Sequence, residues 1–180
     1  MADMMDARIR FGFGLALIVF VLLADQISKW WILEALRLQE RAPIELLPVF
    51  QLNFHANAGV SFGLLRAGST AGVWALTALS AAIAAFFGWW MKTSERLLTT
   101  AALGLVIGGA LGNMIDRLRF GYVVDFLDFH GLGFPWVFNV ADSAISVGAV
   151  LLVLDYFTNP EHQGPSKATK TAAADQRSKP

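Results

Sequence analysis

The stretch Phe138–Leu154, "FNVADSAISVGAVLLVL", has the composition of a membrane-spanning helix, with one acid, Asp142, close to its start. The twelve residues after Asp142 are uncharged. An ionised carboxylate is costly to hold in hydrocarbon, so an acid in a predicted span is by default a functional-site hypothesis. The stretch therefore predicts a transmembrane helix whose first turn carries a functional carboxyl group, and it calls for a partner elsewhere in the chain.

The composition of the whole chain indicates an integral membrane protein. Of its 180 residues 56% are hydrophobic and only 16% are charged, and the mean hydropathy is +0.53. Soluble domains carry about 25% charged residues and could not bury this much apolar surface. The formal net charge is zero, so no nucleic-acid partner is expected.

The residue types also limit the chemistry that the chain can perform. There is no cysteine, which excludes disulfides, thiolate metal sites and a cysteine nucleophile. His55, His130 and His162 show no metal-ligand spacing. We therefore expect neither a metal nor another cofactor.

Four segments are long and apolar enough to cross a bilayer, which takes about 20 residues per helix. They are residues 11–33, 70–91, 97–118 and 136–157. No cleavage site follows the first span, so we expect an uncleaved anchor. Basic residues at the N-terminus, in the "KTSER" loop and in the tail lie on one side, which the positive-inside rule makes cytoplasmic. We expect a membrane domain over 1–160 and a disordered cytoplasmic tail over 161–180.

The loops on the other side, 34–69 and 119–135, carry strand patterns. "FQLNFH" (50–55) alternates apolar and polar residues, and "GYVVDFLDF" (121–129) is rich in β-branched and aromatic residues. "LEALRLQE" (33–40) is amphipathic and predicts a surface helix. The predicted fold is an all-α polytopic membrane protein: four transmembrane helices, a small extracytoplasmic β-containing cap and an amphipathic surface helix.

Polar residues gather near the cap end of the predicted spans. Asp25 and Lys29 lie four apart, hence on one helical face. Asn139 and Asp142 lie three apart at the start of the fourth span, where Asn139 suits a helix N-cap. The other members of the group are Asn57, Asn113, Asp116, Arg117 and Asp125.

Structural interpretations of these residues stay open beside the functional one. Asp25 with Lys29 fits an ion pair that only stabilises a helix, and Asp116 with Arg117 fits pairing at the interface. Glycines recur every four residues in the third span, at Gly104, Gly108 and Gly112, which favours close packing against another helix. Such packing would bring that helix's polar residues close to Asn113 and Arg117.

Asp125 and Asp142 differ from the rest because neither has a basic residue within four positions. Two unpaired acids at one membrane level are expected to face each other. Two close carboxyl groups share a proton and titrate as a coupled pair. In an aspartic peptidase one such acid takes a proton from water and the other, protonated, polarises the scissile carbonyl.

The combined pattern resembles the lipoprotein signal peptidase family, also called signal peptidase II. The matching segments are "DQISK" (25–29), "NAGVSFG" (57–63), "GGALGNMIDRLRFGYVVDFLDF" (108–129) and "FNVADSAI" (138–145). The resemblance covers about residues 11–157, in the same order and with four spans. This chain has Ser61 where the family often has alanine.

The resemblance implies an aspartic peptidase of the bacterial cytoplasmic membrane that cleaves prolipoproteins before a diacylglyceryl-modified cysteine. The family needs no metal and is inhibited by globomycin. The implied catalytic pair is Asp125 and Asp142. The implied supporting and substrate-binding residues are Asp25, Lys29, Asn57, Asn113, Asp116, Arg117 and Asn139, with Asp116 expected to brace Arg117. The expected partners are modified prolipoproteins and membrane lipids, and the chain is expected to be a monomer.

Two other function classes compete with a peptidase. A small proton-coupled transporter also carries intramembrane acids, but such acids are expected near the bilayer midplane and often in repeated halves. Here the acids lie at one interface and no internal repeat is evident. A non-catalytic membrane subunit leaves Asp125 and Asp142 unexplained.

Overall fold

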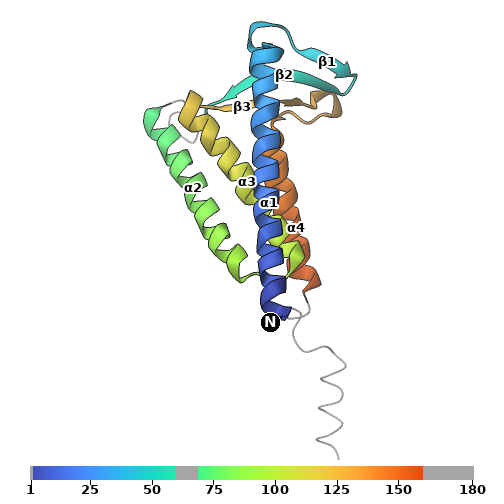
Figure 1. The fold of residues 1–180 in the computed structure, drawn as a ribbon. Coiled ribbons are helices and arrows are strands. Elements are labelled where there is room, and N and C mark those ends of the chain that lie inside the picture. Colours follow the sequence, from blue (N-terminus) through green and yellow to red (C-terminus); the bar gives the residue numbers. More distant parts are fainter. Residues whose placement is uncertain (1, 60–68, 160–180) are drawn as a thin grey trace, which may run out of the picture.

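The computed structural model describes residues 2–59 and 69–159, and it contains four long helices (Figure 1). They are α1 (Ala2–Trp30), α2 (Thr70–Thr93), α3 (Leu97–Phe120) and α4 (Val140–Thr158). All four are long and apolar enough to cross a bilayer. Ser61 and the predicted disordered tail lie outside the described residues.

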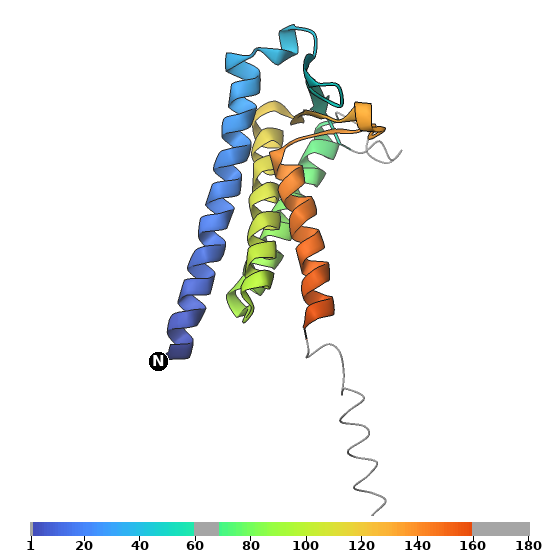
Figure 2. The ribbon, with the colours of Figure 1, turned by 90° about the vertical axis from the view of Figure 1, so that its right-hand side faces the viewer.

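A four-stranded antiparallel sheet lies across the end of the bundle away from the N-terminus (Figures 1 and 2). Its order is β1 (Ile44–Leu47), β2 (Phe50–Asn57), β3 (Val123–Asp128) and β4 (Val137–Phe138). The two strands predicted from the sequence are β2 and β3. They pair with each other, so that His55 lies opposite Asp125. The β-containing cap is therefore confirmed.

The fourth helix starts later than predicted. Val137 and Phe138 pair with Asp128 and Leu127 of β3, so they belong to the sheet. The helix begins at Val140, because Asn139 has an extended backbone and its side chain accepts a hydrogen bond from the Asp142 N–H. This is an N-cap, and it places Asp142 in the first turn of α4.

The prediction of a surface helix over 33–40 is wrong. Residues Trp31–Ala35 extend α1 as a π-helical turn, and Leu38–Glu40 form one short 3₁₀ turn. Arg37 stands between them with a φ of 49°, a left-handed conformation that interrupts a right-handed helix. Ile32 and Leu38 are buried in an apolar cluster with Leu52, Val124 and Phe126 of the sheet. The apolar side of this segment therefore supports the sheet.

Helix α3 is the buried centre of the bundle and contacts each of the other three helices. Its predicted glycine ridge faces α1: a Cβ on Gly108 would meet Val21 and the Ile18 carbonyl, and one on Gly112 would meet Asp25. A second close approach, which the four-residue spacing did not suggest, joins Gly109 to Ala141 and Ile145 of α4. Glycine lets both neighbouring backbones come close enough for polar groups to meet across the helices.

We predict that Gly109→Ala destabilises the protein by about 1–3 kcal/mol, the usual cost of adding a methyl group to a well-packed interior. A Cβ at this position would clash with the Ala141 carbonyl oxygen and with Ile145 Cγ1, which it would meet at 2.8 Å. The measurement is the thermal unfolding midpoint of the purified protein in detergent. Gly88→Ala in α2 is the matched control, because nothing lies within 4 Å of a Cβ there. Equal midpoints for the two variants would contradict the close α3–α4 contact.

Candidate active site

Both predicted acids lie at the sheet end of the bundle. Asp125 is in the middle of β3, and Asp142 is in the first turn of α4. The β4 strand leads directly into α4, so the pairing of β4 with β3 brings the two segments together. The charge of Asp142 acts on Asp125 strongly enough to raise its pKa, as expected of neighbouring carboxyl groups.

Asp125 is completely buried and accepts hydrogen bonds on both carboxyl oxygens. Asn139 Nδ2 donates to its Oδ1 at 2.7 Å, and Asn57 Nδ2 donates to its Oδ2 at 2.9 Å. The pKa of Asp125 is raised to about 7: burial raises it most, the hydrogen bond from Asn57 lowers it, and the charge of Asp142 raises it further. A carboxyl group in this setting keeps its proton up to near-neutral pH.

Asp142 is only partly buried, and it is linked to Asp125 through asparagine side chains. Asn113 Nδ2 donates to Asp142 Oδ1 at 2.8 Å, while Asn113 Oδ1 accepts from Asn139 Nδ2 at 3.2 Å. Asn139 in turn donates to Asp125, so a continuous chain of amides joins the two acids. The Asn139 side chain therefore both caps α4 and donates to the Asp125 carboxyl group.

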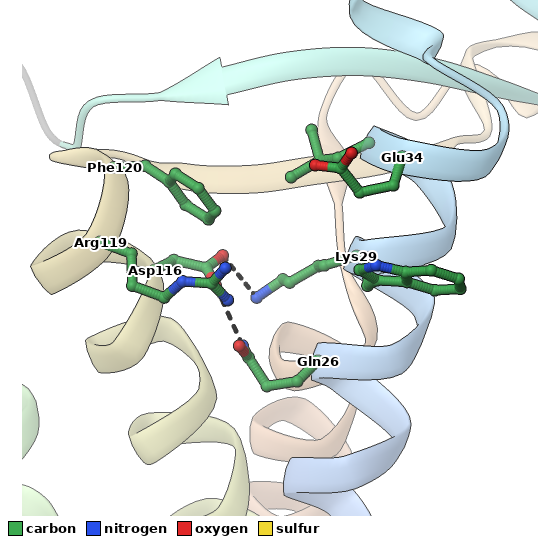
Figure 3. Close-up of a pocket in the computed structure, with 8 residues that line it drawn as sticks. Gln26, Lys29, Glu34, Asp116, Arg119 and Phe120 are labelled. Atoms are coloured by element: carbon green, nitrogen blue, oxygen red, sulfur yellow. Dashed lines mark hydrogen bonds and ion pairs between the residues drawn. The ribbon is translucent and has the colours of Figure 1, made fainter.

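Lys29 lies between two buried carboxylates, those of Asp25 and Asp116. Figure 3 shows its contact with Asp116. Its Nζ is 2.8 Å from Asp25 Oδ2 and 2.8 Å from Asp116 Oδ2, and it also donates to Asn113 Oδ1 at 3.3 Å. Lys29 is 2% exposed and both acids are 0% exposed. The ion pair predicted between Asp25 and Lys29 is present, and it extends from α1 to α3.

The two carboxylates also hold the backbone on which the candidate catalytic acids stand. Asp25 Oδ1 accepts from the Ala141 N–H at 2.9 Å, next to Asp142 in the chain. Asp116 Oδ2 accepts from the Val124 N–H at 3.0 Å, next to Asp125. Each ion-paired acid therefore fixes the position of a residue adjacent to one member of the candidate pair.

Gln26 belongs to the same network, although its sequence context did not single it out. Its Nε2 donates to Asp25 Oδ2 at 3.1 Å and to Asp116 Oδ1 at 3.0 Å, and it lies 3.3 Å from the Gly112 carbonyl oxygen. The signal that could have found it is its place beside Asp25 in "DQISK", since an amide there can reach the glycine ridge of the third span.

Arg117 is near the site but does not have the partner expected for it. Asp116 pairs with Lys29 and Gln26, so the expectation that it braces Arg117 is wrong. Successive helical residues point about 100° apart, which turns Arg117 away from the acid that precedes it. Arg117 Nη1 instead approaches the Asn113 carbonyl oxygen at 3.4 Å, and Asp142, Asp116 and Asp125 are the charges that act on its guanidinium.

A third acid of the sheet, Asp128, is held apart from the candidate pair. Gln51 and Asn53 donate to its Oδ2 at 2.8 and 3.0 Å, and the His130 backbone N–H donates to its Oδ1 at 3.0 Å. Although burial raises the pKa of Asp128, these hydrogen bonds outweigh it and hold the pKa well below the usual range. Asp128 is therefore an ionised structural acid, unlike Asp125, which lies three residues earlier in β3.

The arrangement has the parts required for acid–base attack by water. One carboxyl group is buried and tends to keep a proton, and a second is partly open to solvent, with amides fixing both. Among residues 2–59 and 69–159, no group of three or more histidine, aspartate or glutamate side chains is arranged to hold a metal ion. All nine predicted site residues lie in or beside one polar network, which also includes Gln26.

The chain is similar to known proteins over most of its length. Residues 17–158 match the family model described as signal peptidase (SPase) II. A lipoprotein signal peptidase of Rhizorhabdus wittichii is 49% identical over 86% of this chain and 90% of its own length. That of Caulobacter vibrioides is 46% identical over 84% of this chain and 89% of its own length.

Solved structures agree with the sequence relatives. A bacterial membrane enzyme solved by the in meso method at 2.3 Å resolution superposes with a TM-score of 0.69 at 26% identity, covering 86% of this chain and 95% of its own. A second such structure, at 1.9 Å resolution, has a TM-score of 0.71 at 27% identity and covers 82% and 94%. With its fold, its four apolar helices and these relatives together, the chain belongs to the signal peptidase II family of membrane-embedded aspartic peptidases.

Proposed function

We propose that this chain removes signal peptides from bacterial prolipoproteins by cutting before the diacylglyceryl-modified cysteine, with Asp125 and Asp142 as its catalytic pair. Its family makes it a multi-pass membrane enzyme that acts on prolipoproteins, so the transporter and subunit alternatives fall away. The single observation that supports the assignment of the pair is the amide chain that joins the buried Asp125 to the more open Asp142.

In the proposed mechanism Asp125 carries the proton at the start of the cycle. Asp142, as the carboxylate, takes a proton from a water molecule while the water oxygen attacks the scissile carbonyl carbon. Asp125 gives its proton to the carbonyl oxygen, which forms a neutral tetrahedral diol without a covalent enzyme intermediate. Collapse of the diol breaks the C–N bond, the leaving amine takes the proton held by Asp142, and a diol hydroxyl returns a proton to Asp125. Both acids thereby return to their starting protonation states.

The asparagines and Arg117 have supporting roles in this proposal. Asn57 and Asn139 hold the Asp125 carboxyl group in one orientation by donating to its two oxygens, and Asn113 does the same for Asp142. The guanidinium of Arg117 lies where the pair's negative charges act on it, so it suits contact with the substrate backbone or with the acids during the reaction.

The proposed orientation places the sheet on the outer face of the bacterial cytoplasmic membrane and both termini in the cytoplasm. Support comes from Arg8, Arg10, Lys92 and Arg96, which all belong to the end away from the sheet. A site at the sheet end then meets a membrane-anchored substrate at the level of its cleavage site, without drawing the diacylglyceryl group out of the bilayer.

We predict that Asp125→Asn and Asp142→Asn each lower the rate of prolipoprotein cleavage by about 10²- to 10⁴-fold, the usual contribution of a general acid or base. The measurement is a gel-shift assay with purified, diacylglyceryl-modified substrate. Asp128→Asn is the control on the same strand, and its contacts lie within the sheet and the turn after it, so it should lose far less activity. Wild-type rates in either of the first two variants would exclude the pair.

The raised pKa of Asp125 predicts two pH effects of the same sign. Activity should fall as the pH rises through about 7, because Asp125 loses the proton that it donates. Stability should fall over the same range: the raised pKa favours the folded state at pH below 3.8, and this contribution is lost as the pH rises to about 7. Unfolding midpoints measured from pH 4 to 8 should therefore decline in the wild type and much less in Asp125→Asn. If the midpoints of the wild type and of Asp125→Asn fall equally with pH, the proposal that Asp125 carries the proton is wrong.

We predict that Lys29→Met destabilises the protein by about 3–5 kcal/mol, since it leaves Asp25 and Asp116 as unpaired buried acids. Activity should fall with stability, because both acids position the backbone beside the catalytic pair. The triple variant Lys29→Met, Asp25→Asn, Asp116→Asn should recover part of the lost stability, measured as the unfolding midpoint. If Lys29→Met unfolds like the wild type but is inactive, Lys29 acts in the chemistry instead.

A further inference from the structure

Several buried side-chain atoms without hydrogen bonds lie at the end of the bundle away from the active site. In the part of the chain that the structure describes, three buried side-chain nitrogen or oxygen atoms have no hydrogen bond: Arg10 Nε, Arg96 Nη1 and Asp155 Oδ1. They come from the first turns of α1, from the residue before α3 and from the last turn of α4. Asp155 Oδ1 is ion-paired with Arg96 Nε, so the groups left without a partner are two donors, Arg10 Nε and Arg96 Nη1. Buried donors normally have an acceptor, so these two indicate a ligand that the protein alone does not supply.

The packing of α1 on α3 places Arg10 at the level of Arg96. The two helices run parallel, since Gly14 lies against Thr100 and Gly104, and Asp25 lies against Gly112 at the other end. Arg10 is one helical turn before Gly14, and Arg96 is one turn before Thr100. Arg10 and Arg96 therefore lie at the same level of the bundle, one turn beyond the contact of Gly14 with Thr100.

Only one of these arginines has its charge compensated. Arg96 Nε lies 3.0 Å from Asp155 Oδ1, and Thr99 Oγ1 donates to Asp155 Oδ2 at 2.6 Å, so this pair is held between α3 and α4. Arg10 has no ion pair within the described residues. A bridging water would supply hydrogen bonds but would leave the positive charge of Arg10 unmatched, whereas an anion supplies both.

The surroundings favour the headgroup of a lipid as the source of that anion. Ile9, Phe13 and Leu97 flank the two arginines and are 63%, 43% and 55% exposed. Exposed apolar side chains beside partly buried cations match an amphiphile with a charged head and hydrocarbon tails.

We propose that Arg10 and Arg96 form a binding site for the phosphate group of an anionic phospholipid in the leaflet away from the sheet. Arg10 Nε–H and Arg96 Nη1–H donate to the phosphate oxygens, and the acyl chains lie against Ile9, Phe13 and Leu97. The site fastens the start of α1 to the start of α3 and the end of α4. It is separate from the catalytic pair and does not depend on the proposed reaction.

The test uses delipidated full-length protein in a neutral detergent. Phosphatidylglycerol, phosphatidylcholine or inorganic phosphate is added in increasing amounts, the unfolding midpoint is recorded, and retained lipids are counted by native mass spectrometry. We expect phosphatidylglycerol to raise the midpoint more than phosphatidylcholine. In Arg10→Gln the half-saturating concentration should rise about tenfold, as for loss of one charge-assisted hydrogen bond. Arg8→Gln, the same change at an exposed position two residues away, should stay within about twofold.

Each other outcome overturns the proposal. Equal stabilisation by both lipids, or equal weakening in Arg10→Gln and Arg8→Gln, indicates non-specific attraction. Full stabilisation by inorganic phosphate, with no further gain from lipid, indicates a free anion in place of a headgroup. If Arg10→Gln does not fold, Arg10→Lys takes its place. It keeps the charge but loses Nε–H, and it should still weaken phosphatidylglycerol binding several-fold more than Arg8→Lys does.

Discussion

The structure depends on one buried ammonium group, Lys29, held between the carboxylates of Asp25 and Asp116. Two buried acids on facing helices would repel each other, and a buried charge without a partner is strongly destabilising. With the lysine between them, the same two acids can offer their remaining oxygens to the Ala141 and Val124 backbone N–H groups. The glycine ridge on α3 makes this possible, because Gly112 leaves space for the Asp25 carboxylate. Helix packing and site geometry are therefore parts of a single arrangement.

The two central acids differ because their solvation differs. Asp125 is enclosed by the sheet and by amides, while Asp142 stands in the first turn of α4 and is partly open to solvent. This asymmetry separates the roles in the proposed mechanism: the enclosed acid holds the proton and the open one meets water. The question raised by an acid at the mouth of an apolar helix thus has a physical answer, since a capped helix start at the edge of the bundle is where a carboxylate costs least.

Much of the fold was predictable because it follows from local pattern. Runs of about 20 apolar residues mark the spans, and alternation marks β2 and β3. The errors arose where a tertiary contact overrode the local pattern. Val137 and Phe138 are apolar enough to extend α4, but pairing with β3 takes them into the sheet. The amphipathic segment 33–40 suggested a surface helix, but its Leu38 packs against the sheet, together with Ile32 just before the segment. In the site, Asp116 was matched with Arg117, its neighbour in sequence, whereas its partners Lys29 and Gln26 lie about 90 residues away, which only the packing of α1 on α3 could reveal.

The dual role of Asn139 has a consequence for biosynthesis. Its side chain caps α4 and also donates to Asp125, so the candidate site is complete only when the last helix is wound to its first residue. Asp142 itself arrives with that same helix. A chain still emerging from the ribosome, with three spans inserted, has Asn57 and Asp125 but neither the second acid nor the amide that connects it. The candidate site can therefore assemble only after the fourth helix has formed.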